Sequence, residues 1–488
     1  MDYGAKREIY TLEGLTPEVR AVTFAKCSRS PESFRDIANE LTDEKSAEFH
    51  EKWVVGYGHS SVAEHAVLSI AIENVSNVAT KVIEDNRLAS YTEKSSRYQV
   101  FDKERYYKPK KIMDSDLAET YSQTADMLFD TYNELLEPMK EFIKSKNPQT
   151  EGQSDKAYAS VIKAKVCDNI RYLLPAATQT NLGMTINARN LEHAIVKMLS
   201  HPLDEMREIG QEIKDVALKI TPTLIQFADH NDYLEETKKA LEEKSEEVMN
   251  NEEIKSSEPV KIVNYDQDAE NKLVSALLYP GSRYSYSQIY ERVTKMSDDE
   301  KAEVVDEALK RRGDHDAPIR ELEHIYYTFD ILMDFGAFRD VQRHRICTQS
   351  NQDITCAHGF ATPEDIVEAG QEEKYKAALQ KAWDAYNKIY ARFPKEAQYI
   401  VPMAFYKRVL ITWNLRELHH FIPLRSGKKG HISYRRIAQE CWNKVNEIHP
   451  LLAKYIRVDM SGGSASWAAS LHDEKLCLKP KNYPQENS

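Results

Sequence analysis

An internal repeat constrains this chain more than any other feature of its sequence. "AEHAVLSIAIENVSNVATKVIEDNRLAS" (63–90) is echoed by "LEHIYYTFDILMDFGAFRDVQRHRICT" (322–348), and "LLPAATQTNLGMTINARNLEHAI" (173–195) by "IVPMAFYKRVLITWNLRELHHFI" (400–422). A third pair, 41–53 and 296–309, precedes these in the same order. Three echoes in one order indicate a tandem duplication, so the fold must contain two copies of one architecture.

The boundary between the copies is marked by a change in composition. Residues 242–259, "EEKSEEVMNNEEIKSSEP", are polar, acidic and poor in large apolar side chains. This composition is typical of a solvated helix end that runs into a linker. The sequence therefore predicts a first domain at 1–245, a linker at 246–258 and a second domain at 259–488.

Both copies mix strands and helices. Apolar residues alternate in "VLSIAIENV" (67–75) and "YYTFDILMD" (326–334), which predicts strands covered on one face. Short helices are expected next, at 77–87 and 337–345. Apolar residues at helical spacing predict long amphipathic helices at 117–143 and 372–393. Strands and helices segregated around a small sheet indicate an α+β fold in each copy.

Composition and charge exclude several classes of function. The net charge of −12 argues against a general nucleic-acid binder, because phosphate contacts need a basic face. No run approaches the roughly 18 apolar residues of a membrane span, and no secretory signal is visible. Six cysteines form no CxxC pair, which favours reduced thiols and a cytoplasmic location. Small molecules are the expected partners, with no nucleic acid and no membrane.

A basic cluster in the second copy raises a question about its function. Arg343, His344 and Arg345 stand together as if to hold an anion, yet Asp353 follows ten residues after the first of them. Such a cluster alone is usually solvated surface. Its position after a strand and a short helix, inside a repeat, favours a binding site instead.

At these residues the chain resembles the flavin-dependent thymidylate synthases. That family is marked by Arg-His-Arg, seven residues and a Ser, with an upstream His-x-Ser/Thr-x-x-Glu-His and a downstream Asn-x-Arg, His or Asn, and Arg. The first copy matches at His59, Ser61, Glu64, His65, Ser90, Glu93, Ser95, Arg97, Tyr98, Arg171, Asn187, Arg189 and His193, but carries Asp85, Asn86 and Met198 instead of family residues. The second copy matches at Glu323, His324, Arg343, His344, Arg345, Asn414, Arg416, His420 and Arg425, but carries Asp353, Thr355 and Gln398.

The two copies have thus lost opposite parts of the motif. In the family, active sites lie between subunits of a homotetramer, so the resemblance implies one composite site for dUMP from Ser95, Arg97, Arg171, Arg343 and Arg425. The converse pairing would place Asp85 and Asp353 against a phosphate, and each such pair costs roughly 1–4 kcal/mol at ~4 Å. We therefore expect Asp353 to lie in a half-site that has been given up.

The resemblance also implies a reaction and its cofactors. The family converts dUMP to dTMP, taking carbon from methylenetetrahydrofolate and a hydride from reduced FAD, which NADPH recharges. Arg425 and Ser95 are the candidate catalytic residues, and Arg425 would stabilise negative charge on the uracil. The residues implied in FAD binding are His59, Ser61, Glu93, Arg343, His344, Arg345, Asn414, Arg416 and His420. The implied fold is a small twisted antiparallel sheet flanked by long helices, and a homodimer of fused chains would supply four domains.

Other interpretations remain open from the sequence. The chain could be a non-catalytic flavin- or nucleotide-binding protein, or could act on another pyrimidine nucleotide, since Thr92 replaces a family Asn. Arg97 and Arg171 could simply be ion-paired, and Ser95 could cap a turn. The pair His419–His420 lacks further ligands at metal spacing, so packing and flavin contact are expected and no metal. Cys347 is expected to be a small buried residue, and 425–436 to be loop surface plus Arg425.

Overall fold

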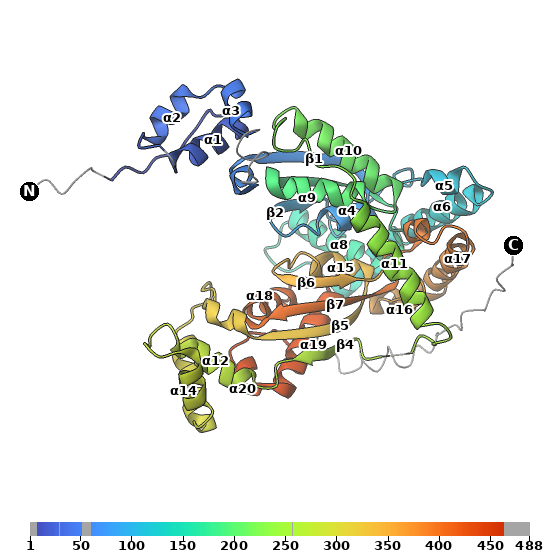
Figure 1. The fold of residues 1–488 in the computed structure, drawn as a ribbon. Coiled ribbons are helices and arrows are strands. Elements are labelled where there is room, and N and C mark those ends of the chain that lie inside the picture. Colours follow the sequence, from blue (N-terminus) through green and yellow to red (C-terminus); the bar gives the residue numbers. More distant parts are fainter. Residues whose placement is uncertain (1–6, 29, 51–59, 256, 463–488) are drawn as a thin grey trace, which may run out of the picture. The chain divides into compact units, whose positions relative to one another are not determined.

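The computed structural model describes residues 7–28, 30–50, 60–255 and 257–462 (Figure 1). The chain forms two compact units, each made of two separate stretches. Unit 1 comprises Met1–Lys94 and Gln179–Glu252, and unit 2 comprises Ser95–Thr178 and Glu253–Ser488. None of the described helices is both long enough and apolar enough to cross a membrane.

Unit 1 is built on a three-stranded antiparallel sheet in the order β1-β3-β2. The strands are β1 (Val67–Ser76), β2 (Ala89–Glu93) and β3 (Gln179–Asn187). Along β1, Leu68, Ile70 and Ile72 are buried, which is the one-sided burial that alternation predicts. The helices are α1 (Pro17–Cys27), α2 (Phe34–Glu40), α3 (Asp43–His50), η2 (Ser60–His65), α4 (Asn77–Ile83), α9 (Ala188–Leu199), α10 (Asp204–Leu218) and α11 (Asp232–Val248).

Unit 2 is built on a four-stranded antiparallel sheet in the order β4-β5-β7-β6 (Figure 1). The strands are β4 (Val260–Tyr265), β5 (Tyr326–Asp334), β6 (Cys347–Asn351) and β7 (Tyr406–Asn414). Phe329 of β5 and Phe421 both pack on the fully buried Trp413 of β7, with ring centroids 5.5 and 4.5 Å away. Phe421 lies on the helix that follows β7, so this aromatic packing anchors that helix to the sheet.

The helices of unit 2 come from both of its stretches. Those from the first stretch are α5 (Lys110–Met113), α6 (Ala118–Glu134), α7 (Leu136–Lys146), α8 (Asp155–Ile170) and η3 (Arg171–Leu173). Those from the second are α12 (Ala269–Leu278), α13 (Tyr286–Val293), α14 (Asp298–Leu309), η4 (Arg320–His324), α15 (Phe335–Val341), α16 (Glu364–Glu368), α17 (Glu372–Tyr390), η5 (Glu396–Ile400), α18 (Leu415–Ser426), α19 (Ile432–Ile448) and α20 (Pro450–Ala453).

The predicted α+β architecture is confirmed, with one small antiparallel sheet in each unit. The strands expected at 67–75 and 326–334 are β1 and β5, and the short helices after them are α4 and α15. The long helix expected at 372–393 is α17. The one expected at 117–143 is interrupted at Leu135 and forms α6 and α7.

The compact units divide the chain differently from the predicted domains. The chain passes from unit 1 to unit 2 at Glu252, within the predicted linker, although 246–248 still belong to α11. The domain bounds expected from the repeat stay a prediction, and residues 95–178 belong to the compact unit that contains the second half of the chain. The physical reason lies in direct contacts: Lys111 pairs with Glu396 at 2.7 Å, and the Ala176 amide donates to the Val401 carbonyl at 2.8 Å.

Candidate functional site

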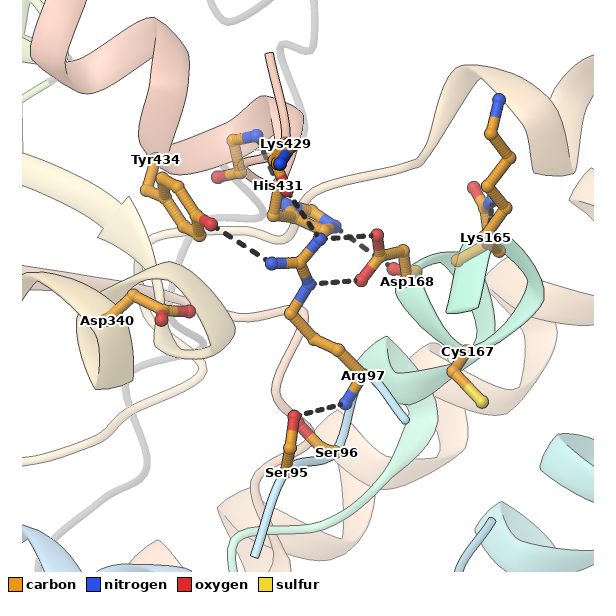
Figure 2. Close-up of polar contacts among 12 residues, drawn as sticks. Ser95, Ser96, Arg97, Lys165, Cys167, Asp168, Asp340, Lys429, His431 and Tyr434 are labelled. Atoms are coloured by element: carbon orange, nitrogen blue, oxygen red, sulfur yellow. Dashed lines mark hydrogen bonds and ion pairs between the residues drawn. The ribbon is translucent and has the colours of Figure 1, made fainter. Parts of the chain in front are cut away.

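Arg97 is the centre of a polar network in unit 2 (Figure 2). It lies in the turn after β2, where its backbone amide donates to the Ser95 hydroxyl at 3.2 Å. Its guanidinium makes a two-pronged contact with Asp168, with Nε and Nη2 at 2.6 and 3.0 Å from the carboxylate oxygens. Its Nη1 donates to the Tyr434 hydroxyl at 3.1 Å. The predicted ion pairing of Arg97 and the predicted turn contact of Ser95 are both present.

The helix α19 begins beside this network. His431 is its N-cap, and the His431 Nδ1 accepts from the Ser433 amide at 3.2 Å. The other ring nitrogen, Nε2, lies 3.1 Å from the Asp168 carbonyl oxygen. Because a carbonyl only accepts, Nε2 must carry the proton and the ring is a neutral tautomer with defined orientation. The start of α19 is thereby tied to the end of α8.

Arg171 lies buried next to this network and has unused donors. Its side chain is only 2% exposed, and its Nε and Nη2 have no hydrogen-bond partner among the described residues. A Cβ added to Gly336, at the start of α15, would lie 3.5 Å from Nη2, so the guanidinium closely approaches that backbone. Asp334, the N-cap of α15, already accepts from the Ala337 amide at 2.7 Å and from the Ser433 hydroxyl. Unpaired buried donors of this kind indicate a place for an anion.

Arg425 approaches the same network from α18. Its Nε donates to the His344 Nε2 at 2.9 Å, and its Nη1 lies 3.5 Å from the Asp340 carboxylate. Its guanidinium carbon is 5.4 Å from the centre of the Tyr434 ring, and that of Arg97 is 5.9 Å from the same ring. The arginine of the first copy and the arginine of the second therefore share one aromatic neighbour.

The surroundings shift the pKa values of the ionisable groups in the network in different directions. Burial opposes the ionisation of Asp168, but the hydrogen bond from Arg97 and the positive charges of Arg171 and Arg97 lower its pKa. Burial also opposes the charge on Arg97, and Asp168 outweighs that effect and raises its pKa. Burial raises the pKa of Asp334.

The remaining second-copy residues lie around the start and middle of α18. Arg343 is exposed, and its charge helps to lower the pKa of Arg425, after burial as the main cause. Arg345 is half-buried, and the exposed His420 ring lies 5.4 Å from that of His344. Asn414 is the N-cap of α18 and accepts from the Glu417 amide at 2.8 Å.

Arg416 has partners within its own unit. Its Nε donates to the Pro318 carbonyl at 2.8 Å, and its Nη1 lies 2.9 Å from the Glu323 carboxylate. The motif residues Glu323 and Arg416 are thus an ion pair between η4 and α18.

The predicted flavin residues of the first copy lie in unit 1. His59 is outside the described residues, and Ser61 is exposed within η2. Glu93 is buried, with its carboxylate 3.3 Å from the Lys81 ammonium. Their roles toward a flavin stay predictions.

Five residues of the network were not foreseen from the sequence: Asp168, Asp340, Glu417, His431 and Tyr434. The expectation that 425–436 is loop surface is wrong, because α19 begins at Ile432 and both His431 and Tyr434 are buried. The helical spacing of Asp168 and Arg171, three residues apart, was a signal that could have been read. The contacts of Tyr434 had no such signal, since they depend on tertiary packing.

The second copy's altered half-site is internally neutralised. The Asp353 carboxylate pairs with Lys395 at 2.8 Å, and the Gln398 side chain accepts from the Ile354 amide at 3.0 Å. In unit 1, Asp85 pairs with Lys197 at 3.0 Å. Each substituted carboxylate thus has a lysine beside it, which reduces any attraction for a further cation.

Two structural interpretations from the sequence are confirmed. Cys347 is buried, and its sulfur lies 2.8 Å from the His344 carbonyl. His419 is 3% exposed and packs in the core of α18, with Nδ1 2.7 Å from Arg312.

The model of one protein family, described as thymidylate synthase complementing protein, matches residues 11–223 and 261–451. The chain belongs to this family. The two matches fall one in each sequence copy, consistent with the tandem duplication.

Relatives of the thymidylate synthase complementing protein family match over different lengths. A Chlamydia pneumoniae protein named UPF0159 protein is 34% identical over 490 residues, 93% of this chain and 92% of that protein. The flavin-dependent thymidylate synthase of Thermococcus onnurineus is 30% identical over 203 residues, 41% of this chain and 72% of that enzyme. A crystal structure of the Helicobacter pylori flavin-dependent thymidylate synthase with FAD and dUMP covers 41% of this chain and 99% of that chain, at 19% identity and a TM-score of 0.30.

Proposed function

We propose that this protein is a flavin-dependent thymidylate synthase that methylates dUMP to dTMP at one composite site per chain. The observation that carries this proposal is the shared contact of Arg97 and Arg425 with Tyr434. The two arginines come from different sequence copies, and each copy lacks the other's part of the motif. Complementary loss is expected if both halves serve one site, and is not expected from undirected decay.

Arg171 is the strongest candidate for holding the nucleotide phosphate. Two of its nitrogens are buried without a partner in the described part of the chain, and an unpaired buried donor costs roughly 1–3 kcal/mol. A phosphate oxygen would satisfy them through charge-assisted hydrogen bonds. Arg97, held rigidly by Asp168, would place a second positive charge nearby, and the exposed Arg343 would reach the same anion.

Arg425 would act on the uracil ring. Loss of the proton at carbon 5 requires negative charge to be stabilised on the ring, and a preoriented guanidinium supplies this stabilisation without reorganisation. The Arg425 side chain is largely buried, and its Nε is hydrogen-bonded to His344. In this low-dielectric environment the guanidinium stabilises negative charge more strongly than it would in water. Ser95, beside Arg97, would complete the substrate side.

The residues near His344 suit a flavin. FAD would supply the hydride, with NADPH and methylenetetrahydrofolate as co-substrates. Arg343 and His420 are exposed and Arg345 is half-buried, and the chemistry of these side chains matches the anionic edge of a reduced flavin ring. His59, Ser61 and Glu93 would complete the flavin site in a homodimer of fused chains, within the cytoplasm.

The test is turnover by the purified full-length protein loaded with FAD. With dUMP, methylenetetrahydrofolate and NADPH, we expect dTMP by mass spectrometry and growth of a thymidine-requiring cell. Arg425→Gln should lower kcat on the order of 100- to 1000-fold. Ser95→Ala and Arg97→Gln, in the other copy, should also impair turnover, whereas Arg392→Ala at an exposed ion pair should not.

Each other outcome identifies an alternative. A colourless protein with no affinity for FAD or dUMP would refute the proposal. Binding of both without turnover would indicate a non-catalytic binder. A methylated product from a different pyrimidine nucleotide would assign another substrate.

A further inference from the structure

A chain of two hydrogen bonds connects Glu417 to Arg425 through His344. The Glu417 Oε1 lies 3.0 Å from the His344 Nδ1, and the His344 Nε2 lies 2.9 Å from the Arg425 Nε. Glu417 and Arg425 stand on the same helix, α18, about two turns apart, while His344 comes from the turn after α15. The histidine therefore bridges two positions of one helix.

The direction of each hydrogen bond follows from the chemistry of arginine. The Nε of arginine only donates, so the His344 Nε2 must accept. A neutral imidazole has one proton, which must then reside on Nδ1 and be donated to Glu417. Burial, with the positive charge of Arg425 next, lowers the pKa of His344 well below its usual range and keeps the ring neutral. Arg425 and Glu417 therefore favour the same tautomer of His344, the one with its proton on Nδ1.

The surroundings restrict movement of all three side chains. His344 is 4% exposed, and the Phe421 ring packs against it edge-on with centroids 5.0 Å apart. Glu417 is 7% exposed, and Asn414 holds its backbone amide at the third position of α18. A ring confined in this way is oriented by its hydrogen bonds and has little freedom to rotate.

We propose that Glu417 is a positioning residue, which fixes the tautomer of His344 and thereby aims the guanidinium of Arg425 at the reacting ring of the substrate. This inference rests on the proposed function only for the identity of the substrate. The hydrogen-bond chain itself is a property of the protein without ligand. If Glu417 served only as a hydrogen-bond acceptor for His344, a change in the charge of Glu417 would not affect Arg425.

The hydrogen-bond chain from Glu417 through His344 to Arg425 should respond to pH near neutrality. Burial raises the pKa of Glu417 to about 7, with His420 and Arg416 opposing the rise. Once protonated, the carboxyl can donate to Nδ1, and the imidazole proton then moves to Nε2, where it opposes the Arg425 Nε–H. The other charged or titratable groups around this chain are Arg416, His420 and Arg425 on α18, Asp340 and Arg343 at α15, Glu323 on η4 and Tyr434 on α19.

The test compares Glu417→Gln with Glu396→Gln in the full-length, FAD-loaded protein. Glu396 is a matched control because it is also a buried carboxylate of unit 2, but pairs with Lys111. For Glu417→Gln we expect kcat to fall about 10- to 100-fold with a smaller change in the KM for dUMP. The acid limb of the parent's pH–rate profile should disappear in Glu417→Gln and persist in Glu396→Gln.

A second readout is independent of turnover. Long-range nitrogen–proton NMR of 15N-histidine protein distinguishes the two neutral tautomers, and His344→Gln assigns the signal. The parent should show the Nδ1–H tautomer at pH 8 and lose it as pH falls through about 7, while Glu417→Gln should show a mixture throughout. A His344 tautomer that ignores both pH and Glu417→Gln would overturn the inference. A parent that makes no dTMP yet shows the tautomer change would refute the proposed function and leave this inference standing.

Discussion

Arg171 is the residue whose environment is least complete. Two of its buried nitrogens have no partner among the described residues, so a bound dianion should stabilise the fold. At dUMP concentrations 100 times the Kd, ligand binding contributes about 2.7 kcal/mol, and the melting temperature should rise accordingly. Arg171→Met should abolish most of this rise, whereas Arg392→Met, at an exposed site, should retain it. Calorimetry with and without dUMP checks the prediction, and an equal rise in parent and Arg171→Met would contradict it.

His431 makes the stability of the protein depend on pH. Burial, with the charge of Arg171 next, lowers its pKa from the usual 6.5 to about 4. The unfolded chain therefore binds a proton that the folded chain excludes, and stability falls as pH drops from about 6.5 to about 4. The full loss is roughly 3 kcal/mol for this one group.

His431→Asn isolates this contribution. Asparagine keeps a side-chain acceptor for the start of α19 and does not titrate. Urea unfolding between pH 4 and 7 should show a shallower loss of stability in the variant than in the parent. His315→Asn, at an exposed position, should keep the parent's slope. The idea is wrong if all three slopes coincide.

The sequence singled out the arginines of the network as candidate site residues, but not the residues that contact them. Ser95, Arg97, Arg171 and Arg425 were found because a family motif spaces them along the chain. Tyr434 could not be found that way, because its position beside two arginines depends on the packing of α19, more than 300 positions along the chain from Arg97.

Among the elements, α9 and α18 form a matched pair for testing. Asn187 caps α9 in unit 1 and Asn414 caps α18 in unit 2, each accepting a hydrogen bond from the amide three residues later. Loss of such a cap costs about 1 kcal/mol. We expect Asn187→Ala and Asn414→Ala to destabilise the protein similarly, and only Asn414→Ala to reduce turnover, since Glu417 and Arg425 stand on α18. Denaturant unfolding and the dTMP assay together check this, and similar turnover in both variants would rule it out.

Most helices and strands were predictable from the local pattern of apolar residues. The exception, the interrupted helix at 117–143, also has a local cause. The alternation in 67–75 and 326–334 predicted β1 and β5 because each strand buries one face. The division of 117–143 into α6 and α7 follows from Pro138, whose missing N–H removes the hydrogen bond that would join the two helices. Proline in the first turn of α7 is tolerated there, so the interruption falls just before it.

The arrangement of the whole molecule was the hardest to predict. The repeat predicted two copies, but not that 95–178 would pack with the second half. In a duplicated sequence, α6 and α17 present similar apolar faces, so local pattern alone does not determine which stretch each will bury against. The contacts in the folded chain, such as the hydrogen bond between Ser96 and Arg339 at 2.9 Å, show that 95–178 packs with the second half.

This arrangement predicts how the site responds to dilution. Arg97 and Arg425 belong to one unit of one chain, so covalent linkage holds them at a high effective concentration. The affinity of the intact protein for dUMP should be the same at nanomolar and micromolar protein. After cleavage at a protease site inserted between Glu252 and Glu253, affinity should fall on dilution as the fragments separate. Titration calorimetry and fluorescence measure both cases, and a dilution-dependent affinity of the uncut chain would contradict the prediction.

The interleaved units also affect how the protein is made. Residues 95–178 leave the ribosome before Glu253 is synthesised, and at 5–20 residues per second the delay is roughly 4–15 s. During that time the apolar face of α6, including the fully buried Tyr121 and Phe129, has not met the surface that covers it in the finished fold. We therefore expect nascent chains to expose the apolar face of α6 early in translation, and their yield in cells to depend on holding chaperones and on translation speed.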